Sequence, residues 1–153
     1  MSIQEKLTEL GLELPPVAAP AGAYVPAVAT GNLVFSAGQL PIKAGTLIAT
    51  GHVPQNVTLV TAQACARQAF LNALAAVASV AGGIDRIARI VRLNVFVNSS
   101  AGFTEQAKVA NGASDLLLQL FGDAGKHTRC AIGAAELPLN APVELDIVAE
   151  VRT

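Results

Sequence analysis

Arg129 is the residue whose type and setting are most suggestive of chemistry. It opens a predicted strand, Arg129 to Ala135, whose other side chains are small or apolar. A guanidinium in such a setting needs an anionic partner or water, and its planar fork suits a carboxylate or a phosphate. A bound anion is one explanation; an exposed strand end or a structural ion pair is another.

Two further groups near Arg129 in the sequence could move protons. Glu144 follows fifteen residues later and begins the next predicted strand, on the face that also holds Asp146 and Glu150. Its carboxyl could act as an acid or a base, although the same pattern describes a solvated strand face. His127 lies two residues before Arg129 and has the same potential, although a loop histidine is more often simply solvated.

Other residue types give weaker signals. Tyr24 is the only tyrosine, and Ser36 ends a predicted strand without the Gly-x-Ser-x-Gly elbow of a serine hydrolase. The two cysteines, Cys65 and Cys130, lack metal-type spacing, and we expect both to be reduced and buried in a cytoplasmic protein. With two histidines and no CxxC or HxxxH pattern, a zinc site is not expected, and no phosphate-binding or dinucleotide motif is present.

The composition limits the possible partners. Of 153 residues, 52% are apolar and only 14% are charged, with a net charge of −1. These values argue against a disordered chain and against nucleic-acid binding through a strong positive field. So few charges make a thin polar surface, which favours an oligomer that hides part of it.

A membrane or export role is not expected. The longest uncharged stretch, 68–84, contains Gln, Asn, Ser and Gly residues and is shorter than a spanning helix needs. Residues 1–14 carry three glutamates and one lysine, which is wrong for a signal peptide.

Periodicity predicts an N-terminal appendage, residues 1–20, and one domain, residues 21–153. The appendage holds a helix at 2–10, with Ser2 and Glu5 at capping-box spacing, and a Pro/Ala linker. In the domain we predict helices at 57–81 and 103–121 and strands at 25–29, 33–36, 46–49, 86–97, 129–135 and 143–151. Regular alternation along 86–97 would place Arg86 and Arg92 opposite Arg89 and so break up a basic patch.

This order of elements predicts an α+β fold, with two long helices on one face of a single mixed sheet. The other face of the sheet then needs a cover. No further helix is available for this face except the short N-terminal one, so a partner subunit is the expected cover.

The sequence resembles the RidA/YjgF family, also called endoribonuclease L-PSP, from about residue 21 to residue 152. The first and last blocks together are specific. The matching segments are YVPAV at 24–28, GNLVFSAGQLP at 31–41, ARQ at 66–68, VFV at 95–97, VAN at 109–111, RCA at 129–131, LP at 137–138 and VEL at 143–145.

The resemblance implies a chorismate-mutase-like fold and a homotrimer with a central β-barrel and clefts between subunits. It implies hydrolysis of enamines and imines such as 2-aminoacrylate and 2-iminobutanoate to 2-keto acids and ammonia, without a cofactor. The small-molecule substrate would be a carboxylate held by Arg129, and Glu144 would position water. Tyr24, Ser36 and Asn111 match family positions that line the cleft.

Three departures point to a divergent subgroup. Ala131 stands where the family often has a cysteine, and His127 replaces the proline of its proline-x-arginine motif. The segment 42–56 is longer than usual. Two alternatives stay open: a non-catalytic metabolite-binding or regulatory protein of the same fold, and, less favoured by the charge, an endoribonuclease.

Overall fold

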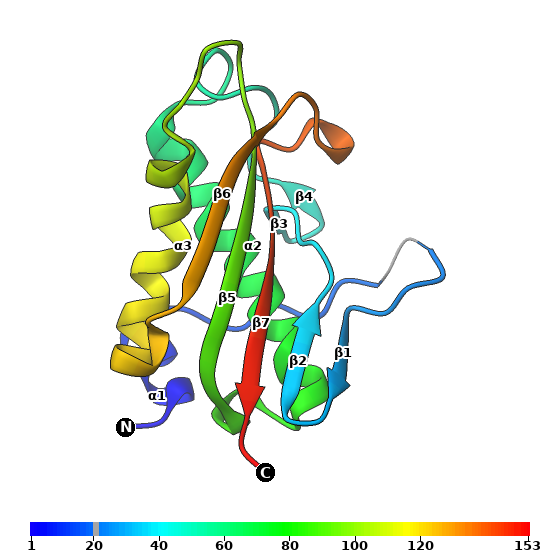
Figure 1. Cartoon of the computed structure of the whole chain (residues 1–153), viewed down its shortest axis with the longest axis vertical. Coiled ribbons are helices and arrows are strands. Elements are labelled where there is room, and N and C mark those ends of the chain that lie inside the picture. The colour runs from blue at the N-terminus through cyan, green and yellow to red at the C-terminus, as the bar shows by residue number, and fades with distance from the viewer. Residues whose placement is uncertain (20–21) are drawn as a thin grey trace.

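The computed structural model describes residues 1–19 and 22–153 (Figure 1). Its main element is a five-stranded sheet in the order β1-β2-β7-β5-β6. The β5–β6 pair is parallel and the other pairs are antiparallel, so the sheet is mixed as expected. The strands are β1 (Ala27–Thr30), β2 (Leu33–Ser36), β5 (Ile87–Asn98), β6 (Thr128–Ala134) and β7 (Val143–Val151).

A small hairpin stands apart from this sheet. The strands β3 (Ile42–Lys43) and β4 (Thr46–Leu47) pair only with each other. The prediction of one single sheet was therefore incomplete, because these two short strands form a second sheet of their own.

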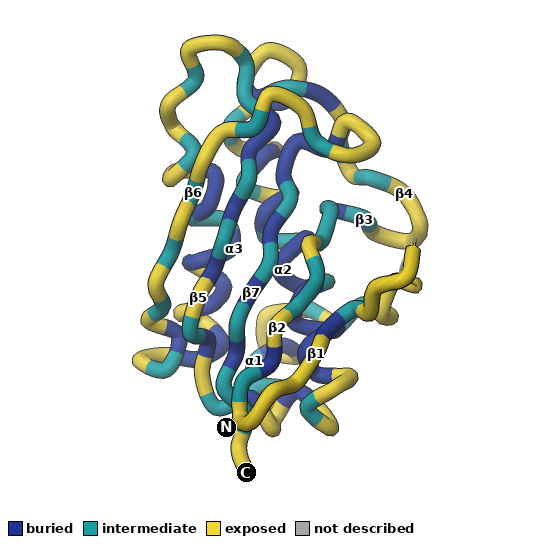
Figure 2. The backbone as a smooth tube through the Cα atoms, turned by 45° about the vertical axis from the view of Figure 1, so that its right-hand side comes forward, coloured by how far each residue is buried: buried dark blue, intermediate teal, exposed yellow. Residues whose placement is uncertain are grey.

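The two long helices, α2 (Leu59–Ala81) and α3 (Gln106–Phe121), lie on one face of the sheet, as predicted. The short helices η1 (Ile84–Arg86), η2 (Gly122–Gly125) and η3 (Pro138–Asn140) occupy connections. Strand β7 shows why the sheet and the helices form two layers. Its even-numbered side chains are half-buried on the open face of the sheet, whereas the odd-numbered ones from Val143 to Ala149 are buried under the helices. Figure 2 shows the buried backbone concentrated in the central strands and the helices behind them.

α2 is the main core helix. Among the described residues, this helix alone is long and apolar enough to cross a membrane by length and composition. Of its 18-residue apolar stretch, however, 61% is buried within the fold. Its buried face includes Cys65, Phe70 and Leu74, each 0% exposed. This burial is what a core helix of a globular domain requires.

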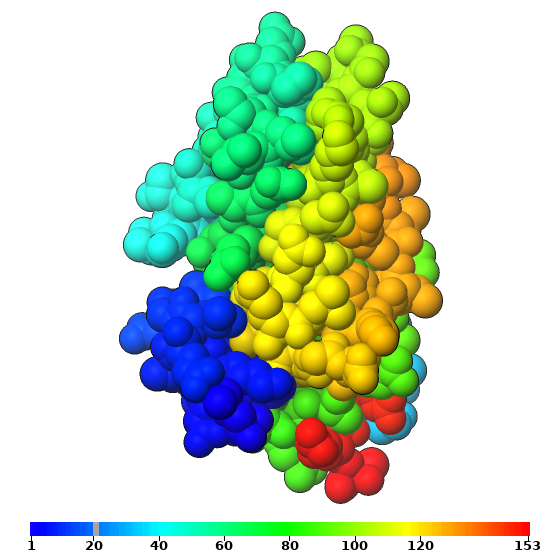
Figure 3. All heavy atoms as spheres, turned by 90° about the vertical axis from the view of Figure 1, so that its left-hand side faces the viewer, coloured from blue at the N-terminus to red at the C-terminus, as the bar shows by residue number. Residues whose placement is uncertain are grey.

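The N-terminal helix α1 (Ile3–Glu9) is attached to the ends of η1 and α3 (Figure 3). The predicted capping box of Ser2 and Glu5 is present. Asp85 Oδ1 also accepts hydrogen bonds from the backbone N–H of Ile3 (2.7 Å) and of Gln4 (3.2 Å). Leu7 is fully buried, so this short helix contributes to the same core.

The placement of arginines along β5 differs from the prediction. Two register shifts between β5 and β7 make Ile87, Ile90 and Leu93 all buried, at a spacing of three. Arg89 and Arg92 are therefore both exposed, instead of facing opposite sides of the sheet. A β-bulge adds an unpaired residue, so strict alternation fails on either side of it.

Cys130 also differs from the prediction, because it is exposed. It pairs in register with Asn94 on the open face of the sheet. Cys65 is buried as expected, and burial raises the pKa of its thiol to about 11.

Gly112 sets the closeness of α2 and α3. A Cβ atom at this position would overlap the main-chain atoms of Gln63 in α2. Gln63 also donates from Nε2 to the carbonyl of Lys108 in α3 (2.8 Å). The two helices therefore approach at a distance that only glycine permits.

We predict that Gly112→Ala lowers the free energy of unfolding by about 1–3 kcal/mol, because α3 must shift away from α2. The same change at an unhindered helix position stabilises by about 1 kcal/mol. Urea unfolding followed by circular dichroism measures the effect. Asp115→Ala, on the exposed surface of α3, serves as the control and should change little. A more stable Gly112→Ala protein would contradict the close approach.

Candidate functional site

Glu144 lies in an open groove of about 710 Å³ between the start of β7 and the β1–β2 edge. Tyr24, Ser36 and Gly38 line the same groove. The Oγ of Ser36 accepts a hydrogen bond from the backbone N–H of Ile147 (3.0 Å), which ties β2 to β7 beside the carboxyl. A Cβ atom at Gly38 would overlap Oε1 of Glu144, so glycine leaves the space that this carboxyl occupies.

The environment of Glu144 favours its protonated form. Partial burial raises the pKa of its carboxyl, and the negative charge of Asp146 on the same face raises it further. A carboxyl with a raised pKa is better suited to accept and return a proton near neutral pH than an exposed one.

Arg129 lies on the other side of the sheet, between β6 and α3. Its Nη1 donates to Oδ1 of Asn111 (2.8 Å) and to Oγ of Ser114 (3.1 Å), both on α3. The ion pairs found within residues 1–19 and 22–153 do not include Arg129, so its charge has no carboxylate partner there. The guanidinium is half-buried and therefore suited to bind an external anion.

His127 belongs to the Arg129 half of the site. Its Nε2 lies 2.9 Å from Oγ of Ser114, and its Nδ1 lies 2.6 Å from the carbonyl oxygen of Gly125. Both ring nitrogens thus have partners within the chain. Ala131, two residues beyond Arg129, is half-buried on the same side of β6 and presents only a methyl group.

Ser114 is the polar residue that the sequence reasoning missed. It is 7% exposed and contacts both Arg129 and His127. The signal was its position three residues after Asn111, which places both side chains on the same face of a helix.

The sheet separates the two groups of residues within one chain. Arg129 is in register with the buried Leu93 and therefore points toward the helices. Glu144 is in register with Phe96, three residues further along β5, and points to the open face. Thus Tyr24, Ser36 and Glu144 come together, Asn111, His127 and Arg129 come together, and the two groups do not meet.

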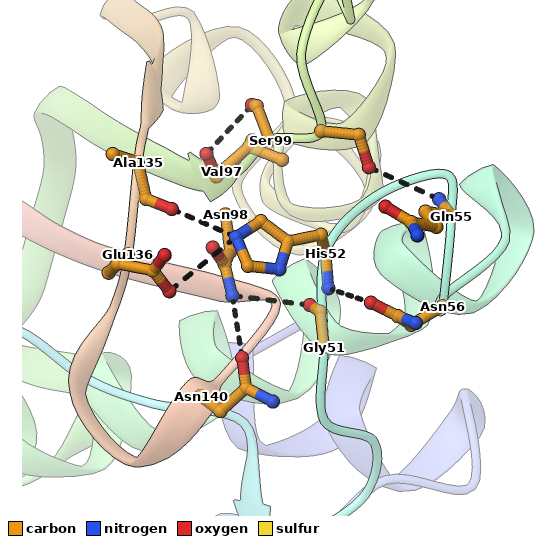
Figure 4. Close-up of polar contacts among 11 residues, drawn as sticks. Gly51, His52, Gln55, Asn56, Val97, Asn98, Ser99, Ala135, Glu136 and Asn140 are labelled. Atoms are coloured by element: carbon orange, nitrogen blue, oxygen red, sulfur yellow. Dashed lines mark hydrogen bonds and ion pairs between the residues drawn. The ribbon is translucent and has the colours of Figure 1, made fainter.

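A second polar cluster fixes the segment that leads into β7 (Figure 4). Asn98, at the end of β5, is 0% exposed and donates from Nδ2 to the carbonyl of Gly51 (3.3 Å) and to Oδ1 of Asn140 (3.2 Å). Nε2 of His52 lies 3.5 Å from Oε2 of Glu136. This cluster ties the loop before α2 to the β6–β7 connection, and so supports the start of β7, where Glu144 lies.

Metal binding finds no support in the described part of the chain. No group of three or more His, Cys, Asp or Glu side chains in residues 1–19 and 22–153 could hold an ion.

Comparison with known proteins gives a consistent set of relatives. The family model described as "YjgF/chorismate mutase-like, putative endoribonuclease" matches residues 4–151. The chain is 45% identical to Protein TCP17 of Trypanosoma cruzi over 151 residues, which are 98% of this chain and 94% of that protein. It is 28% identical over 130 residues to a 2-iminobutanoate/2-iminopropanoate deaminase of Dermatophagoides farinae, covering 84% of this chain and 86% of that protein.

A solved structure agrees with the fold. The crystal structure of the protein Atu1372 from Agrobacterium tumefaciens, whose function is unknown, superposes with a TM-score of 0.90 at 42% identity. The alignment covers 98% of this chain and 92% of that one. The expected fold type is therefore confirmed over nearly the whole chain, including the region of α1.

We predict that Glu144 titrates above the ordinary glutamate pKa of about 4.3. Asp146→Asn should lower its pKa, since one of the two causes is removed. Because the folded-state pKa lies above the unfolded-state value, the stability that Glu144 contributes is lost as the pH rises through the folded-state pKa.

A carbon-13 NMR titration of the side-chain carboxyls measures both effects. Glu150→Gln, on the same face of β7 but outside the causes of the shift, is the matched control and should leave the pKa of Glu144 unchanged. A pKa at or below that of an exposed glutamate would contradict the desolvation of this carboxyl.

Proposed function

Because the chain belongs to the YjgF/chorismate mutase-like family, we propose that it hydrolyses imines or enamines of small 2-keto acids, releasing the keto acid and ammonia. The observation that supports this most is the unpaired, half-buried guanidinium of Arg129, anchored on Asn111 and Ser114. The name of the Dermatophagoides farinae relative, a 2-iminobutanoate/2-iminopropanoate deaminase, supports the same reaction.

The active unit in this proposal is a homotrimer. Since Arg129 and Glu144 point to opposite faces of the sheet, one chain offers two incomplete halves of a site. A complete site would form where the Arg129 half of one protomer meets the Glu144 half of its partner. Exposed apolar side chains on the open face and around the Glu144 half support such a contact: Tyr24 (55%), Val25 (57%), Val28 (54%), Phe35 (39%) and Ile132 (46%).

The reaction needs only a held substrate, one oriented water and proton transfer. Arg129 binds the carboxylate and so fixes the neighbouring imine carbon. Glu144 accepts a proton from water as the water oxygen bonds to that carbon. It then returns the proton to the nitrogen, which gives a carbinolamine. Glu144 next accepts the proton of the new hydroxyl as the carbonyl forms and the C–N bond breaks, and passes this second proton to the departing nitrogen, which leaves as ammonia. The raised pKa of Glu144 suits this exchange.

The direct test supplies 2-aminoacrylate from serine with a serine dehydratase and follows pyruvate through lactate dehydrogenase. The protein should accelerate pyruvate release. Arg129→Ala should reduce kcat/KM roughly 100-fold, because two charge-assisted hydrogen bonds of about 1.5 kcal/mol each are lost. Arg152→Ala, an exposed arginine at the C-terminus, is the matched control and should keep full activity.

Two results would contradict the proposed function or the role of Arg129. If Arg129→Ala keeps full activity, the role of the arginine is wrong. If the unmodified protein binds 2-keto acids without accelerating release, the non-catalytic alternative is favoured instead.

A mixing experiment tests the site between protomers. Arg129→Ala and Glu144→Gln should each be inactive alone. Proteins unfolded and refolded together should recover about a quarter of full activity, because a quarter of randomly formed interfaces pair an intact arginine with an intact glutamate. No recovery from mixed oligomers would place both residues of a working site in one chain.

A further inference from the structure

We propose that His127 and Ser114 are positioning residues that leave one defined edge of the Arg129 guanidinium, its Nε–Nη2 edge, free for a carboxylate. This inference rests on the proposed function only in taking a carboxylate as the ligand. It assigns a role to Ser114, which lies outside the resemblance to known family sites, and a different role to His127 from direct substrate contact.

The carbonyl oxygen of Gly125 fixes the donor and the acceptor in each hydrogen bond that links it, through His127 and Ser114, to Arg129. The carbonyl oxygen of Gly125 can only accept, so Nδ1 of His127 carries the proton at 2.6 Å. In the neutral ring Nε2 is then an acceptor, and the hydroxyl of Ser114 donates to it at 2.9 Å. The lone pairs of that hydroxyl remain free to accept from Nη1 of Arg129 at 3.1 Å. These three hydrogen bonds, from Arg129 through Ser114 and His127 to Gly125, form a chain that we call the relay. Each bond in it has one defined donor and one defined acceptor.

The same relay decides which guanidinium edge is free. Nη1 has two N–H groups, and the hydrogen bonds to Asn111 and Ser114 use both. Within residues 1–19 and 22–153, Nε and Nη2 of Arg129 take part in none of the side-chain hydrogen bonds found. A carboxylate can therefore bind side-on, through Nε and Nη2, and the end-on mode that needs Nη1 is blocked.

Burial protects the hydrogen bonds of the relay from competition by water. Ser114 is 7% exposed and lies on the face of α3 that packs toward β6, so water has little access to compete for its hydroxyl. His127 is half-buried. Removing the hydroxyl leaves an N–H of Arg129 and the Nε2 of His127 without their partners, and the guanidinium gains freedom to rotate.

The first arm of the test uses nitrogen-15 NMR of the free protein, independent of any activity. His127 should show a protonated Nδ1 and an unprotonated Nε2. Rotation of the Nη1 group of Arg129 should be slow, and should become fast in Ser114→Ala. A protonated Nε2 in the neutral ring, or rotation unchanged by Ser114→Ala, would overturn the inference even if the protein is an active deaminase.

The second arm uses steady-state kinetics with 2-aminoacrylate. Ser114→Ala and His127→Ala should raise KM about tenfold with kcat changed by less than about twofold, since a carboxylate held equally in ground and transition states affects binding alone. Ser114→Thr, which keeps a hydroxyl, should stay close to the unmodified enzyme. Ser79→Ala removes another helix hydroxyl, one bonded only to its own helix, and is the matched control.

The two failures are distinguishable. An active protein whose KM is insensitive to Ser114→Ala overturns the positioning role and leaves the proposed function intact. An inactive protein that shows the expected His127 tautomer and the slow Arg129 group overturns the proposed function and supports the relay. If Ser114→Ala fails to fold, His127→Gln, which loses the bond to Gly125, should still raise KM; an unchanged KM would overturn the relay.

Discussion

The alternation of side chains across the sheet is the constraint on which the site depends. A residue of a strand can face the helices or the open side, and the register of its neighbours decides which. Pairing opposite the buried Leu93 of β5 turns Arg129 toward α3, whereas pairing opposite Phe96 of the same strand turns Glu144 to the open face. One strand thus places the cation and the carboxyl of the proposed reaction on opposite sides of the same protomer.

The electrostatic consequences follow from that division. Among the residues that the structure describes, Arg129 has neutral hydrogen-bond acceptors but forms no ion pair with a carboxylate, so its charge is left for a ligand. Partial burial raises the pKa of Glu144, and the negative charge of Asp146 raises it further. A partner protomer would bring the two together and cover apolar side chains such as Phe35. The low charge content of the chain then has a physical purpose, since part of the surface would be hidden in the assembly.

The supporting structure lies mostly away from the reacting groups. α3 supplies Asn111 and Ser114 to Arg129, and its distance from α2 is set by Gly112. At the end of β5, the buried Asn98 donates hydrogen bonds to Gly51 and Asn140 and so fixes the segment that enters β7. The precision of each half-site therefore comes from helix packing and from a buried amide, and neither touches the substrate in the proposed reaction.

The main elements and the residue types of the site could be predicted from the residues alone. β7 has the predicted bounds, because its alternation of apolar and polar residues is regular, and both long helices follow from apolar periodicity closed by glycine. The orientation and pairing of the side chains follow instead from the folded arrangement of strands and helices. The bulges that bring Arg89 and Arg92 to the same side, the exposure of Cys130, and the relay from Arg129 through Ser114 to His127 all depend on strand register and helix contact. Such contacts join residues distant in the chain, which no local pattern of residues encodes.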